Sequence, residues 1–228
     1  MNAVINNYIQ SFLHPFDQHE KLHGIREGLS KRKKEALTVV SEDSLNEEIP
    51  VKLSFVEAMS VSWLLKMVYS FYSMVSIHLG LISYKLMSED SSFADLLFND
   101  FPMKAQKALL FTTLLSAIFY PLVLWIYTKF WSVIIKFFSM LFDIKGDVES
   151  MTDEVVNHSL VSNMFLLVPV FGEAAKNFCS FIYIFAGLKK NFGMNSLQSI
   201  VVLSAPLFLF IVMLLCFSLI FMLFVNIL

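Results

Sequence analysis

The chain has 228 residues, of which 57% are hydrophobic and 16% are charged; its mean hydropathy is +0.66 and its formal net charge is −2. Soluble domains are about 45–50% apolar and about 25% charged, so this composition excludes an ordinary soluble domain. Because the apolar residues lie in long runs, the sequence predicts an all-α polytopic membrane bundle. We expect about five transmembrane helices, an N-terminal amphipathic helix, and no nucleic-acid partner.

Residues 1–57 are predicted to form a cytoplasmic arm. Apolar residues recur at helical spacing over residues 1–16, which indicates an amphipathic helix that ends near His14, ahead of Pro15. This helix lies either on the membrane or on the protein's own cytoplasmic face. We expect no cleavable signal peptide. A polar linker follows, and its basic cluster either holds lipid headgroups or serves only as a topology signal: Lys31, Arg32, Lys33 and Lys34.

Residues 58–228 are predicted to form the membrane domain, and its first span is 58–87. Lys66 lies near one end of this span and is expected to snorkel to the headgroups. His78 is either a hydrogen-bonded structural residue or part of a proton relay. The acidic segment 88–107 is predicted to be a loop.

The second span is predicted at 108–127, with Pro121 as a kink and a continuation to residue 142 along the interface. A polar loop over 143–154 separates it from a third span at 155–171. The first half of this third span is polar, so it must face other helices or line a polar path. The residues that suggest such a path are Asn157, His158 and Asn163, together with His78 of the first span.

A helical hairpin ends the chain, with spans at 173–188 and 194–228. No charged residue follows Lys190, and Lys189 and Lys190 mark the turn between the two arms. Five spans place this pair of lysines on the same side as the basic N-terminal arm. The positive-inside rule therefore predicts a cytoplasmic N-terminus and an external C-terminus.

The sequence contains none of the catalytic, nucleotide-binding or metal-binding motifs HExxH, GxSxG, P-loop and CxxC. We therefore expect no enzyme activity and no cofactor. His19 and His23 are four residues apart and could bind a divalent metal, but solvated pairs of this kind are common, and we expect no metal site. Glu173 and Lys176 either line a pathway as ionisable groups, or Glu173 caps its helix and pairs with Lys176.

The hairpin also carries a family resemblance. Val168-Pro169-Val170-Phe171-Gly172 forms a Pro-x-x-Gly turn, and Gly187-Leu188-Lys189-Lys190 leads into Asn191-Phe192-Gly193-Met194-Asn195-Ser196. These segments resemble the last two helices of the Yip1 domain, bacterial-type members included. The chain departs from the family pattern at Asn191–Phe192, where the family has a hinge histidine, and at Leu197–Gln198, where Lys-Ala is usual.

The resemblance implies a non-enzymatic membrane protein that acts as a scaffold or organiser. Its partners would be the lipid bilayer and other membrane proteins or further copies of itself. Eukaryotic members of the family act in vesicle trafficking with small GTPases, through a longer N-terminal region. The short arm here favours a bacterial cytoplasmic (inner) membrane protein, with the ER or Golgi membrane as the alternative. A second class of function stays open: a small transporter or channel subunit with a polar path along the third helix.

Overall fold

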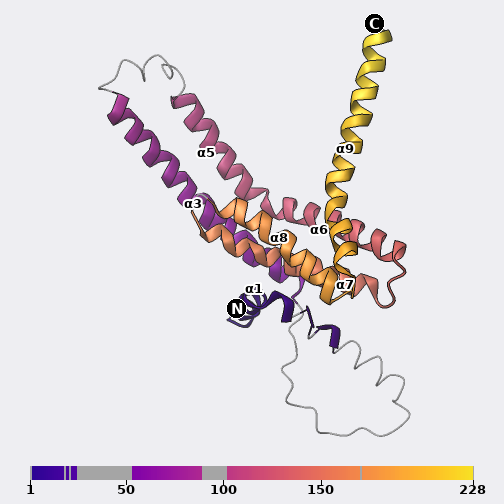
Figure 1. Ribbon diagram of the computed structural model, residues 1–228. Helices are drawn as coiled ribbons and strands as arrows, with labels where there is room; N and C mark the ends of the chain where they lie inside the picture. Colours follow the sequence, from indigo (N-terminus) through magenta and orange to yellow (C-terminus); the bar gives the residue numbers. More distant parts are fainter. Residues whose placement is uncertain are drawn as a thin grey trace, which may run out of the picture. The chain divides into compact units, whose positions relative to one another are not determined.

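The computed structural model describes residues 2–17, 19–20, 22–24, 53–88, 102–169 and 171–227. Every regular element in these ranges is a helix, which confirms the all-α prediction (Figure 1). The elements are α1 (Asn2–Leu13), α3 (Phe55–Ser88), α5 (Pro102–Ile118), α6 (Tyr120–Leu141), α7 (Val148–Ser159), the 3₁₀ helix η1 (Leu160–Leu167), α8 (Gly172–Lys190) and α9 (Ser196–Ile227).

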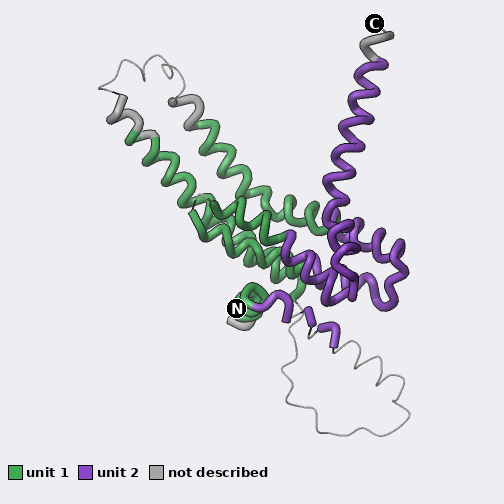
Figure 2. Tube along the Cα trace, viewed as in Figure 1, with its two compact units in different colours: residues 1–13, 53–129, 157–180 green, residues 14–52, 130–156, 181–228 purple. Residues whose placement is uncertain are grey.

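These elements divide into two compact units (Figure 2). Unit 1 draws on residues 1–13, 53–129 and 157–180, so it contains α1, α3, α5, η1 and the first halves of α6 and α8. Unit 2 draws on residues 14–52, 130–156 and 181–228. The predicted boundary between an arm and a membrane domain at residue 57 stays a prediction, because residues 25–52 lie outside the described part.

Polar side chains cap the first turns of the helices. Ser54 and Glu57 form a reciprocal capping box at the start of α3, with the Ser54 amide 3.0 Å from the Glu57 carboxylate. Asn195 and Gln198 form the same kind of box at the start of α9. The Asn195 amide donates to the Gln198 side-chain oxygen at 2.9 Å, and the Gln198 amide donates to the Asn195 side-chain oxygen at 2.8 Å. Asp147 accepts the Ser150 amide at 3.2 Å and starts α7. Because each cap satisfies amides that have no partner within their helix, these short motifs fix where the helices begin.

The predicted second span, 108–127, with its kink at Pro121, corresponds to parts of two helices, because the chain breaks between α5 and α6 at Phe119. Pro121 has no amide hydrogen to donate to the carbonyl of Ala117, four residues earlier. The indole nitrogen of Trp63 in α3 donates to that carbonyl instead, at 2.9 Å. The kink expected at Pro121 is therefore real, and a side chain from a neighbouring helix supplies the missing hydrogen bond.

The predicted loop 143–154 and the third span 155–171 are also corrected. The helix α7 already begins at Val148, and it gives way to the 3₁₀ helix η1 at Leu160. Ser162 donates to the carbonyl of Ser159 at 2.7 Å, and the Asn163 amide donates to the carbonyl of Leu160 at 2.7 Å. Side chains that bind nearby carbonyls offer the backbone an alternative to α-helical bonding.

The N-terminal helix α1 ends at Leu13, as predicted from Pro15, and packs on α3 and η1 within unit 1. Tyr8 is buried, and its hydroxyl lies 3.1 Å from that of Ser62 and donates to the Leu160 carbonyl at 2.7 Å. Packing on the protein's own helices is therefore confirmed for α1. Its exposed Ile5, Ile9 and Leu13 still leave an apolar face that suits a membrane surface.

Replacing Tyr8 by phenylalanine is expected to lower the free energy of unfolding by about 0.5–1.5 kcal/mol, because it removes the buried hydrogen bond to the Leu160 carbonyl, to which Asn163 still donates. Hydrogen exchange should show the loss first in α1. The control is Gln10→Ala, since Gln10 is exposed on the same helix. Equal exchange protection of α1 in Tyr8→Phe and the parent chain would contradict the assigned role of this hydroxyl.

Two helices in the described residues are long and apolar enough to cross a membrane: Tyr120–Leu141, with mean hydropathy 1.4, and Ser196–Leu223, with 2.9. The apolar stretch Lys107–Ile118 is shorter. The candidate span in α6 thus covers the segment that the sequence had assigned to the interface. The number of five spans stays a prediction.

Candidate functional site

A polar pocket of about 480 Å³ lies within unit 1, between α3, α5 and the first turn of α8. Its volume falls in the range of about 300–1,000 Å³ that is usual for small-molecule sites. Ten residues line it, and nine of them are polar or carry a hydroxyl: Lys66, Tyr69, Tyr72, Ser73, Ser76, Ile77, Thr112, Thr113, Ser116 and Glu173. Polar groups gathered in this way on otherwise apolar helices make the pocket the candidate functional site.

An ion pair joins two sides of the pocket. The ammonium of Lys66 in α3 lies 2.5 Å from the carboxylate of Glu173 in α8. The Lys66 side chain is 8% exposed and that of Glu173 is 48% exposed, so the carboxylate is the member of the pair that a ligand can reach. The expectation that Lys66 snorkels to the surface is wrong, because a carboxylate is available to it inside the protein.

Aromatic rings surround the same lysine. The Lys66 ammonium lies 4.7 Å from the centre of the Tyr69 ring and 5.6 Å from that of Tyr120. The Lys176 ammonium lies 5.8 Å from the centre of the same Tyr120 ring. Glu173 forms its ion pair with Lys66. The expected pair between Glu173 and Lys176 within α8 is thus replaced by one between two helices.

Hydroxyl groups from α3 and α5 form the walls. Tyr72 donates to the carbonyl of Leu166 in η1, and Thr113 and Ser116 bond to carbonyls of their own helix. Within the part of the chain that the structure describes, the hydroxyls of Ser73, Ser76 and Thr112 have no hydrogen-bond partner. These three hydroxyls are therefore available to a ligand.

A glycine sets the position of Glu173. A Cβ atom at Gly172 would lie 2.6 Å from the carbonyl oxygen of Phe165 and 3.2 Å from the Cα of Leu166. Only glycine fits this close approach of two backbones, at the point where the Pro-x-x-Gly turn enters α8. The turn residue that carries part of the family resemblance thus also places the carboxylate in the pocket.

The polar residues of the predicted third span are buried inside unit 1. Asn157 donates to the Leu53 carbonyl at 3.2 Å, Asn163 donates to the Ser62 hydroxyl at 2.9 Å, and the Tyr120 hydroxyl donates to the Asn163 side chain at 2.6 Å. His158 is fully buried. These contacts join α7 and η1 to neighbouring segments, and such a structural role accounts for the two asparagines without a polar path.

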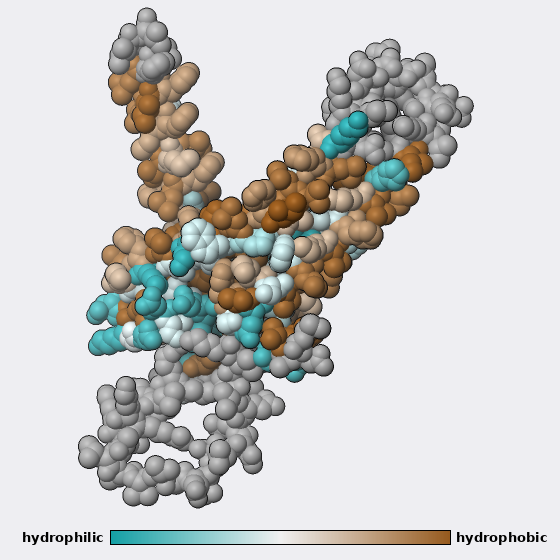
Figure 3. All heavy atoms as spheres, turned by 180° about the vertical axis from the view of Figure 1, so that it is seen from behind, coloured by the Kyte–Doolittle hydropathy of each residue, from teal (hydrophilic) through white to brown (hydrophobic). Residues whose placement is uncertain are grey.

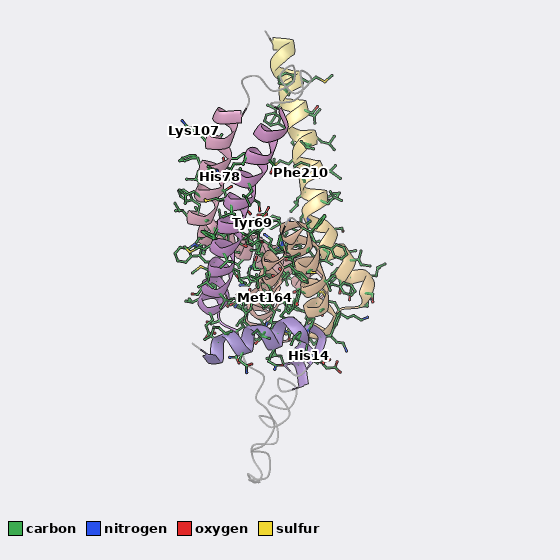
Figure 4. All side chains as sticks on the ribbon, turned by 90° about the vertical axis from the view of Figure 1, so that its left-hand side faces the viewer. His14, Tyr69, His78, Lys107, Met164 and Phe210 are labelled. Carbon is green, nitrogen blue, oxygen red and sulfur yellow. The ribbon has the colours of Figure 1, made fainter. Side chains whose placement is uncertain are left out.

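The other candidate residues do not meet in the pocket. His78 is exposed on α3, nine residues beyond Tyr69 (Figure 4), and it is not among the residues that line the pocket, although the preceding residue, Ile77, is. The cluster Lys31, Arg32, Lys33 and Lys34 lies outside the described residues. In the parts that the structure describes, no three His, Cys, Asp or Glu side chains could hold a metal ion.

In unit 2, the lysines of the predicted hairpin turn end α8, and Lys189 is exposed. Lys190 reaches Glu20 at 2.6 Å. Asn191 donates to the buried carboxylate of Glu154 at 3.1 Å, so the residue that stands in place of the family's hinge histidine has a structural partner. Glu154 belongs to α7 and not to a loop, which is why the sequence did not reveal this contact.

The Glu20–Lys190 pair should be visible in a pH titration. The hydrogen bond from Lys190 and its charge hold the pKa of Glu20 below the ordinary value for glutamate. The contribution of this pair to folding is therefore present above the unfolded-state pKa and is lost as the pH falls through the lower folded-state pKa. NMR titration of the Glu20 carboxyl should show the shift, and Lys190→Gln should remove it. A Glu20 pKa that does not respond to Lys190→Gln would contradict the contact.

Sequence reasoning missed most of the pocket, although a signal for it existed. Tyr69, Tyr72, Ser73 and Ser76 recur at positions i, i+3, i+4 and i+7, which places them on one face of α3. Lys66 extends the same stripe toward the start of the helix. A polar stripe within an apolar helix indicates a face turned away from lipid.

Comparison of the chain with protein-family models, with curated proteins and with solved structures gives no match.

Proposed function

We propose that the chain is an integral membrane protein that works as a non-enzymatic organiser, similar in kind to the Yip1 family that its hairpin motifs resemble. The observation that carries the membrane part is the uncovered apolar surface of α9. Large apolar side chains from Leu207 to Leu223 are each at least 39% exposed, whichever side of the helix they lie on. Figure 3 shows apolar residues along the face of α9 that is in view.

The free-energy cost of keeping this apolar surface in water supports the membrane proposal. Fifteen large apolar side chains are exposed over these residues. Moving each out of water is worth about 1.5 kcal/mol or more, so together they outweigh the net stability of a whole domain, about 5–15 kcal/mol. A helix that is apolar all round has no polar face for water, which favours lipid as its surroundings. The 28 residues of Ser196–Leu223 span about 42 Å, more than the hydrocarbon core of about 30 Å.

Orientation and role follow from the charge pattern and the resemblance. We propose a cytoplasmic N-terminus and an external C-terminus, since the basic residues of the arm and of the Lys189–Lys190 turn then share one side. The bacterial cytoplasmic membrane is the proposed location. Acting through helix and lipid contacts requires no catalytic group, which agrees with the motif search.

The test is expression of the full chain followed by extraction of membranes with alkaline carbonate. We expect the protein to stay in the membrane pellet, and a reporter fused to the C-terminus that works only in the cytoplasm to be silent. Release into the carbonate supernatant would refute the membrane proposal. An active reporter would refute the orientation alone.

A transporter or channel subunit is the second candidate function, and the pocket between α3 and α5 is the observation that favours it. Single cysteines at positions 76 and 112 should then react with an aqueous reagent in a background that lacks Cys179 and Cys216. Cysteines at buried positions 158 and 162 serve as the control. Failure of positions 76 and 112 to react would remove the support for a water-filled path.

A further inference from the structure

The surroundings of the pocket restrict what can enter it. Exposed apolar side chains lie on the same stretches of α3 and α5 that carry the polar lining: Phe71 is 72% exposed, Val75 44%, Phe111 64% and Leu115 40%. This inference rests on the proposed function and extends the membrane to these stretches of α3 and α5, so that an occupant arrives through an apolar surface. A molecule with a polar head and an apolar tail meets both conditions, because its head fills the pocket while its tail covers the exposed side chains.

The charges in the pocket restrict the polar head. Lys66 is buried and already bound to Glu173, so it offers little to an anion. Lys66 occupies one oxygen of the Glu173 carboxylate, and the exposed half of that carboxylate can accept from a second donor; a primary ammonium supplies three N–H groups. The rings of Tyr69 and Tyr72, whose centres are 5.1 Å apart, lie in the same lining and add favourable faces for a cation.

The hydroxyl groups complete the match. Ser73 and Ser76 in α3 and Thr112 in α5 can donate to phosphate oxygens, as serine and threonine do at phosphate sites. From these observations we propose that the pocket binds a zwitterionic phosphoethanolamine group, with its ammonium on Glu173 and its phosphate on the Ser73, Ser76 and Thr112 hydroxyls. The apolar surroundings assign this group to a phospholipid rather than to a free metabolite.

The proposal is tested with the full-length protein in detergent, by native mass spectrometry of bound short-chain lipids. The probes are dihexanoyl phosphatidylethanolamine, the phosphatidylcholine and phosphatidylglycerol analogues, and free phosphoethanolamine. We expect the ethanolamine lipid to bind about tenfold more tightly than either analogue, because only its ammonium donates charge-assisted hydrogen bonds to Glu173. Free phosphoethanolamine should bind at least about tenfold more weakly than the lipid, since it lacks the apolar tail.

Variants separate this site from general lipid binding. Ser76→Ala combined with Thr112→Val should weaken binding of the ethanolamine lipid about tenfold through loss of two hydrogen bonds, with little change in thermal stability. Ser60→Ala is the matched control, because Ser60 is exposed on α3 and bonds to its own helix at the Val56 carbonyl. Glu173→Gln should remove the preference for ethanolamine over choline.

Three results would overturn the proposal: equal binding of all three lipids, unchanged binding by the Ser76 and Thr112 double variant, or free phosphoethanolamine binding as tightly as the lipid. The last result would assign the pocket to a soluble zwitterion. These outcomes are distinct from failure of the proposed function, because carbonate extraction tests membrane insertion without reference to the pocket.

Discussion

Replacing Glu173 by glutamine is expected to lower the free energy of unfolding by about 3 kcal/mol, because it leaves the ammonium of Lys66 buried without a counter-charge. In a chain of this length such a loss lowers the midpoint of thermal unfolding by about 6–12 °C. The measurement is thermal unfolding of the full chain in detergent micelles.

Removing the other partner of the ion pair should lower the free energy of unfolding by less. Lys66→Met leaves Glu173 alone, but that carboxylate is 48% exposed and water can reach it. Combining Lys66→Met with Glu173→Gln should recover much of the stability lost in Glu173→Gln alone, since no buried charge then remains. A double variant that is less stable than Glu173→Gln would contradict the assignment of the loss to an unpaired lysine.

A second ion pair provides the matched control. Lys136 and Glu149 lie 3.0 Å apart, but their side chains are 33% and 79% exposed. Exposed pairs contribute about 0–1 kcal/mol, so Glu149→Gln should change stability by less than that. If Glu149→Gln and Glu173→Gln lowered the free energy of unfolding equally, burial of Lys66 would not be the reason for the loss in Glu173→Gln.

The second large effect is expected at Gly187, where α8 passes α7 in unit 2. A Cβ atom there would lie 2.5 and 2.6 Å from the two Cγ atoms of Val155, which is fully buried. Gly187→Ala is therefore expected to destabilise the chain by about 1–3 kcal/mol, because neither helix can move without loss of packing. Thermal unfolding in micelles again measures the change.

Gly80 in α3 is the control for this prediction, since nothing lies within 4 Å of a Cβ atom there. Gly80→Ala should raise stability by about 0.5–1 kcal/mol, because alanine restricts the unfolded chain and favours a helix. Val155→Ala in the Gly187→Ala background should restore part of the loss by removing the two close Cγ atoms. We expect Gly187→Ala to lower stability and Gly80→Ala to raise it. Changes of the same sign would contradict the close approach of Gly187 to Val155.

Several features of the fold could be predicted from local sequence. The end of α1 ahead of Pro15, the kink at Pro121 and the apolar helix that begins at Ser196 all follow from a single proline or from an unbroken apolar run. Such signals act on the backbone within a few residues, so they do not depend on what packs against the helix.

Other features could not be read from the sequence, because they depend on atoms from distant segments. Residues 148–154 look like a polar loop until Asp147 is seen to cap α7 and Asn191 to bind Glu154. The 3₁₀ helix η1 likewise depends on partners, since Tyr8 and Tyr72 donate to its carbonyls from other helices.

The sequence by itself determined that the chain is helical and strongly apolar, with its longest uncharged run after Lys190, because composition and periodicity act along the chain. Only the tertiary structure decided which charges meet. Glu173 lies three residues from Lys176 in sequence and 107 residues from Lys66, yet it pairs with Lys66. A buried ammonium needs a counter-charge wherever the packing provides one, and a polar stripe on α3 becomes a pocket only when α5 and the start of α8 close around it.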